Sequence, residues 1–118
     1  MSIITYGMGV VWAEQACDEL NIDAEILDLR SLTPLDYDSI RFCTEKTGKV
    51  LVLHEDTLTG GIGAEVSAWI NEHCFTMLDA PVTRVGGLDT PIPFAAELEA
   101  QFMGSNRLNK AINNLLSY

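Results

Sequence analysis

The sequence has few basic residues. Its 118 residues include 7 Lys and Arg against 17 Asp and Glu, which gives a formal charge of −10. Such an acidic chain is poorly matched to the phosphates of DNA or RNA and to anionic membrane surfaces. Two explanations remain open: a basic protein partner, or a surface whose charge simply keeps the protein well solvated.

Long hydrophobic runs and a leader peptide are also missing. No apolar run approaches the ~20 residues that cross a bilayer, and the first residues, MSIITY, have neither a basic region nor a long apolar one. Cysteine is scarce, and Cys17, Cys43 and Cys74 are an odd number at wide spacing. This pattern favours reduced, buried thiols in the cytoplasm over a disulfide framework. We found no repeat, low-complexity tract or linker, so we expect one domain over residues 1–118.

What the sequence does contain is an alternation of two periodicities. Short β-type segments occupy residues 3–6, 24–29, 50–53 and 81–85, and helical spacing of apolar residues appears between and after them. The run VLVL at 50–53 does not alternate, which is typical of a strand buried on both faces that stops at His54. Asp36 and Gly48 suit the two caps of a helix over about 36–47, and two prolines make 86–94 a loop. The pattern predicts a three-layer α/β/α domain on a largely parallel sheet.

Glycines follow two of the predicted strands. Gly7 and Gly9 lack the third glycine of a dinucleotide-binding fingerprint, so a tight turn explains them better. Gly60, Gly61 and Gly63 lack the Lys-Ser/Thr of a phosphate-binding P-loop. We therefore expect these three glycines to serve loop geometry at the start of a helix, with Gly60 or Gly61 at positive φ or in close backbone contact. Anion binding at that helix N-terminus stays open.

Polar residues at strand ends are weak site candidates. His54 and Glu55 lie at the carboxyl end of a buried strand, where open α/β sheets bind ligands, and an imidazole beside a carboxylate can exchange protons. No nucleophile accompanies them, so we interpret His54 as a histidine satisfied by hydrogen bonds. Arg30 is expected to pair with nearby acids, such as Asp36 or Glu55, rather than with a substrate. No residue is assigned a catalytic, cofactor-binding or metal-binding role.

Three segments in register carry a more specific signal. They are LDLRSLTPLD at 27–36, VLHEDTLTGGIGAE at 52–65 and LDAPVTRVGGLDTPIPF at 78–94. In this order and spacing the chain resembles the C-terminal, transketolase-like domain of the β subunit of 2-oxo acid dehydrogenase E1 components. The resemblance covers essentially the whole chain. It implies a five-stranded, mostly parallel sheet with one antiparallel strand, and a fragment without the N-terminal pyrimidine-binding domain of the β subunit.

The same resemblance implies a function for the parent enzyme. Such enzymes use thiamine diphosphate and Mg²⁺ to decarboxylate a 2-oxo acid, and then pass the acyl group to the lipoyl arm of the E2 acyltransferase. His54-Glu55 with Thr59-Gly60-Gly61 favours the branched-chain (2-oxoisovalerate) type over the pyruvate type. The motifs for the cofactor are absent, so this domain alone is expected to be non-catalytic and to bind no cofactor.

The expected roles are assembly and docking. The implied partners are the E1 α subunit or α half, a second β copy, and the subunit-binding domain of E2. Asp79 and the terminal carboxylate of Tyr118 are the candidates for contact with basic residues of E2. A free-standing binding or regulatory module and an independent enzyme centred on His54 or a cysteine are the alternatives.

Overall fold

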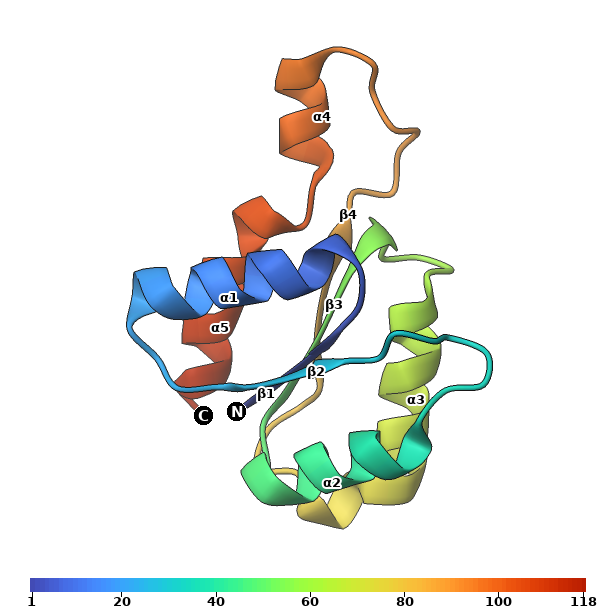
Figure 1. Ribbon diagram of the computed structural model, residues 1–118, viewed down its shortest axis with the longest axis vertical. Coiled ribbons are helices and arrows are strands. Elements are labelled where there is room, and N and C mark those ends of the chain that lie inside the picture. The colour runs from blue at the N-terminus through green and yellow to red at the C-terminus, as the bar shows by residue number, and fades with distance from the viewer.

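The computed structural model describes residues 1–118 as a four-stranded sheet between two layers of helices (Figure 1). The strands are β1 (Ser2–Thr5), β2 (Glu25–Asp28), β3 (Val50–Thr57) and β4 (Thr83–Gly87), in the order β2-β1-β3-β4 and all parallel. The helices are α1 (Met8–Leu20), α2 (Tyr37–Thr47), α3 (Ile62–Cys74), α4 (Ala96–Phe102) and α5 (Ser105–Leu116), with a short 3-10 turn at Phe75–Met77. The three-layer α/β/α class is therefore confirmed.

The strand count is a correction. We expected five strands with one antiparallel, and the sheet has four, none of them antiparallel. All four β-type segments of the sequence are already in the sheet. The residues that follow β4 form a loop with Pro91 and Pro93 and then two helices, so they offer no further extended segment.

The central strand explains the two layers. Leu51 and Leu53 of β3 pack in a core cluster with α1 and α5, whereas Val50 and Val52 pack in a second cluster with α2 and α3. All four side chains are buried, as expected for a strand covered on both faces. Trp69 of α3 packs against the second cluster, and its ring stacks on Tyr37 of α2 and on His73.

Helix termini match the expected caps. The Asp36 side chain accepts from the backbone N–H of Ser39 at 3.0 Å, and Gly48 ends α2 in the left-handed conformation. Asn21 ends α1 in the same way. No helix is long and apolar enough to cross a membrane, and all three cysteines are free thiols, two of them buried.

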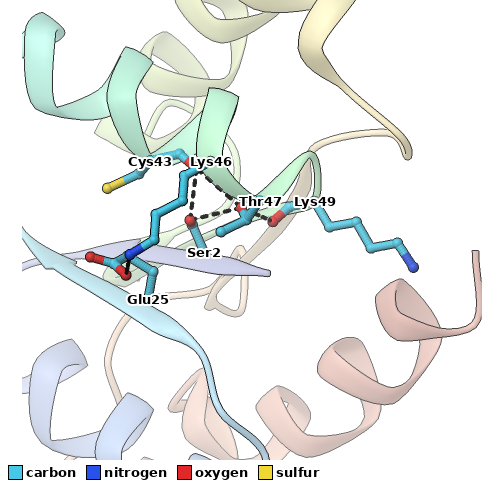
Figure 2. Close-up of polar contacts among 6 residues, drawn as sticks. All are labelled: Ser2, Glu25, Cys43, Lys46, Thr47 and Lys49. Carbon is cyan, nitrogen blue, oxygen red and sulfur yellow. Dashed lines mark hydrogen bonds and ion pairs between the residues drawn. The ribbon is translucent and has the colours of Figure 1, made fainter.

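A hydrogen-bonded cluster ties β1 to α2 at the amino edge of the sheet (Figure 2). Ser2 Oγ donates to the carbonyl of Cys43 at 3.0 Å and lies 2.8 Å from Thr47 Oγ1. Lys46 forms an ion pair with Glu25 of β2. Because these contacts fix the end of α2, they also place Gly48 and the residues beside it.

Two strand boundaries differ from expectation. Strand β3 does not stop at His54 but continues to Thr57 through an irregularity in its pairing with β4. Strand β4 begins at Thr83 rather than Pro81 and includes Gly86 and Gly87, which we expected in a loop. Pro81 lies outside β4 because proline has no N–H to donate to a neighbouring strand. Gly86 and Gly87 lie so close to the backbone of β3 that a Cβ at either position would overlap a carbonyl oxygen there.

Candidate functional sites at the two ends of the sheet

The carboxyl edge of the sheet collects most of the polar candidates, because parallel strands all end on the same side. His54 is fully buried there, on the same face of β3 as Val52, and neither of its ring nitrogens has a hydrogen-bond partner in the protein. Our expectation that hydrogen bonds satisfy His54 is therefore wrong. Burial lowers the pKa of the imidazole, and Asp56 opposes this shift.

His54 and Glu55 do not form an acid–base pair. Consecutive residues of a strand point to opposite faces, and the exposed Glu55 carboxylate lies near Gly7 at the start of α1, whereas His54 faces the start of α3. The pKa of Tyr6, on the same edge, is raised first by burial and then by the carboxylates of Asp56 and Glu55. The two side chains therefore cannot share a proton directly.

Three glycines enclose the His54 ring. A Cβ on Gly61 or on Gly86 would lie 2.8 Å from His54 Cε1, and one on Gly63 would overlap Cδ2 and Nε2. Gly60, at the exposed tip of the turn, has φ of 79° and no neighbour within 4 Å of a Cβ position. The imidazole therefore packs closely against the amino end of α3.

Hydrogen bonds hold the turn at residues 57–63 to β4 and to the segment that follows β4. Asp89 accepts from the backbone N–H of Thr59 at 2.9 Å and from its hydroxyl at 2.7 Å, and these bonds lower the pKa of Asp89. Arg84 donates to the carbonyl of Leu58 at 2.9 Å. Arg30, in contrast, is exposed at φ of 55° and pairs with a nearby acid, as expected, but that acid is Asp28 at 3.1 Å rather than Asp36 or Glu55.

The segment over residues 88–102, here called the arm, projects from the body and carries α4 (Figure 1). Its exposed apolar side chains are Leu88, Ile92, Phe94 and Leu98, with Phe94 fully exposed and Ile92 64% exposed. Only its base is anchored. There Phe102 packs on Gly87, and Arg107 donates to the carbonyls of Gly86 and Phe102 at 2.6 and 3.0 Å. The arm therefore exposes several large apolar side chains.

Both docking candidates lie at the opposite, amino edge of the sheet. The backbone N–H of Asp79 donates to the carbonyl of Gly48 at 2.7 Å, and the Asp79 carboxylate is exposed without a hydrogen bond or ion pair. Next to Gly48, Lys49 donates to the carbonyl of Leu116 at the end of α5 with a distance of 3.1 Å. Tyr118, 72% exposed, follows directly. The exposed Asp79 carboxylate and the residues that follow α5 therefore share this end of the molecule.

A groove of about 700 Å³ runs between α3 and the segment leading into β4. Small side chains of α3, Ala64, Ser67 and Ala68, line one wall, and Asp79 and Arg84 are its charged residues. No group of three or more His, Cys, Asp or Glu side chains is placed to hold a metal ion. The donor set of these residues does not fit Mg²⁺ with a bound diphosphate.

Comparison with known proteins gives a consistent result. Residues 1–107 match the family model described as "Transketolase, C-terminal domain". The chain is 46% identical over 98% of its length to the 2-oxoisovalerate dehydrogenase subunit beta of Pseudomonas aeruginosa, and 42% identical over its whole length to that of Bacillus subtilis. The pyruvate dehydrogenase E1 component subunit beta of Bacillus subtilis is 46% identical over 80% of the chain.

The chain spans about a third of the length of these relatives, 33%, 38% and 30% respectively. Among solved structures, a protein described as "Split gene transketolase, inactive beta4 tetramer" superposes with a TM-score of 0.79 at 25% identity. That match covers 98% of this chain and 38% of the other.

Proposed function

Because the chain belongs to the transketolase C-terminal domain family, we propose that it is the assembly and docking domain of an E1 component of the 2-oxo acid dehydrogenase type. The parent protein would be a cytoplasmic, thiamine diphosphate-dependent enzyme that decarboxylates a branched-chain 2-oxo acid and acylates the lipoyl group of E2. The observation that carries the proposal is the identity of 46% over 98% of the chain with a 2-oxoisovalerate dehydrogenase β subunit.

The branched-chain substrate is favoured by coverage rather than by identity. The pyruvate dehydrogenase relative of Bacillus subtilis has the same identity, 46%, but aligns with only 80% of the chain, whereas the two 2-oxoisovalerate relatives align with 98% and 100%. Pyruvate remains the second candidate substrate for the same reaction. Thiamine diphosphate and Mg²⁺ would be held by other parts of the enzyme, because the residues described here do not fit them.

Assembly would use the arm. Ile92, Phe94 and Leu98 expose apolar area that a second β copy or the α subunit would bury, and the base of the arm is held rigidly by Arg107 and Phe102. A solved structure with a similar fold is described as a tetramer, which supports contact between copies. A rigid base matters because ordering a flexible segment on binding opposes association.

Docking of E2 would use the amino edge of the sheet. Asp79 and the carboxylate of Tyr118 are exposed there and free of internal partners, so basic residues of E2 could bind both. Bidentate contacts from Arg to such carboxylates are strong and specific. Long-range attraction by a chain with a charge of −10 would speed association at low salt.

The experiment restores the full E1 and measures its affinity for the subunit-binding domain of E2 by calorimetry at low and high salt. Asp79→Asn and deletion of Tyr118 should each weaken binding by roughly tenfold at low salt, and by less at high salt. Glu14→Gln, which removes the same charge from the exposed face of α1, is the matched control and should have little effect. Unchanged affinity in both docking variants would exclude this surface.

A further inference from the structure

His54 is the one buried histidine of the chain. It is fully buried at the end of β3, and both ring nitrogens lack a protein partner. The other histidine, His73, is exposed, and its Nδ1–H donates to the Trp69 carbonyl at 2.9 Å. A buried imidazole tolerates this environment while neutral, because a charged one would need acceptors for two N–H donors.

The ring lies where two segments meet. On one side it contacts Gly61 and Gly63 at the start of α3, and on the other it contacts Gly86 of β4. All three glycines are too close to the imidazole to carry a Cβ without displacement. The imidazole therefore fills the junction between the turn at residues 57–63 and the end of β4.

The charged groups around this junction do not neutralise a protonated ring. Asp56, on the same strand, favours the charged form, and Arg84 on β4 opposes it. Glu65 on the first turn of α3 is exposed, and Arg107 of α5 donates to the Gly86 carbonyl. The positive end of the α3 dipole also faces the ring and disfavours a second positive charge.

We propose that His54 is a proton-sensitive latch: uptake of one proton by its imidazole releases the turn at residues 57–63 from β4 and opens the carboxyl edge of the sheet. The hydrogen bonds from Thr59 to Asp89 and from Arg84 to Leu58 are the contacts that would be lost on opening. This proposal is independent of the function of the parent enzyme, because it concerns only contacts within this chain.

The direction of the pH dependence follows from the linkage between proton binding and opening. Burial holds the pKa of His54 below its ordinary value of 6.5 in the closed form, and the exposed ring of the open form would recover that value. The closed form therefore binds fewer protons, and it is fully favoured above a pH of about 6.5. As the pH falls below this value toward the pKa of the closed form, the opening equilibrium should rise, approaching tenfold per pH unit.

The test is amide hydrogen exchange on the 118-residue chain between pH 5 and 8, corrected for the intrinsic exchange rate, together with an NMR titration of both imidazoles. We expect protection at residues 57–63 and 84–89 to fall by up to tenfold per pH unit below about 6.5. We also expect His54 to titrate below the ordinary histidine value of about 6.5. Amides of β1 and α2 should not follow this dependence.

Variants separate His54 from other titrating groups. His54→Phe and His54→Leu keep an apolar filler at the junction, and whichever folds should lose the pH dependence, whereas His73→Gln should retain it. A folded His54 variant with the same pH-dependent loss of protection would overturn the proposal. Wild-type protein in which His54 titrates at or above about 6.5, with no accompanying opening, would overturn it equally, and this result needs no variant.

Discussion

Replacing Leu51 by Ala tests whether β3 is the central strand of the core. Leu51 is fully buried and lies in register with Ile3 of β1 on one side and Thr83 of β4 on the other. Its cluster also contains Leu108 and Ile112 of α5. Neighbouring strands and two packed helices restrict collapse into the cavity, so we expect the free energy of unfolding to fall by about 3–5 kcal/mol, the upper part of the range for buried Leu→Ala changes.

The same loss can be expressed as a thermal shift. A chain of 118 residues has an unfolding entropy of roughly 0.25 kcal/mol per kelvin, so the midpoint should drop by about 12–20 °C. Urea unfolding followed by tryptophan fluorescence measures the change directly. Phe42→Ala on α2 is the control, because Phe42 is 62% exposed and should cost under about 0.5 kcal/mol. A Leu51→Ala loss below about 1 kcal/mol would refute the placement of β3.

Two further predictions concern ligand binding and the glycine turn. The isolated chain should not bind thiamine diphosphate in the presence of Mg²⁺, because it has no suitable donor set, and a saturable Mg²⁺-dependent isotherm in titration calorimetry would contradict this. Replacing both Gly60 and Gly61 by Ala should destabilise the domain or weaken its association. The reason is that Gly60 has φ of 79° and a Cβ on Gly61 would overlap the carbonyl of Thr57; each strained residue should cost at least about 1 kcal/mol. Circular dichroism and sedimentation would measure the loss, and specific ATP or NAD binding abolished by the double change would show that the turn binds nucleotides instead.

Local sequence signals predicted the centre of the fold well. The unbroken run at 50–53 identified a strand covered on both faces, because no alternation means no solvent face. Asp36 and Gly48 located both ends of α2, since caps act through contacts within a few residues. The expected fifth strand came from the resemblance alone, and no fifth β-type segment was found in the sequence.

Contacts distant in sequence explain what could not be predicted. Gly86 and Gly87 read as loop residues, yet they belong to β4 because His54 and Phe102 pack against them from other elements. The unpartnered ring of His54 depends on the same packing and has no local signature. Arg30 pairs with Asp28 rather than with Asp36 or Glu55, and its left-handed backbone conformation has no local signature in the sequence.

Local sequence patterns also do not predict the exposure of the arm. Ile92 and Phe94 are separated by a proline in a region without periodicity, and nothing in their spacing indicates exposure. The signal available was compositional: apolar residues in a proline-containing loop have no helix or strand face to bury. Spacing could not show that Asp79 and Tyr118 share one end of the molecule, because that depends on contacts of Gly48 and Lys49 with distant segments.

The association state of the parent β subunit, alone and with its α partner, tests the central claim most directly. Sedimentation velocity should show the wild-type β subunit associating with a second copy and with α. A variant with Ile92→Ser and Phe94→Ser, both on the exposed arm, should dissociate toward single subunits while its thermal midpoint stays within a few degrees, because neither side chain packs in the core. A double variant that assembles like the wild type, or a wild-type subunit that binds neither partner, would contradict the assignment of this domain to E1 assembly.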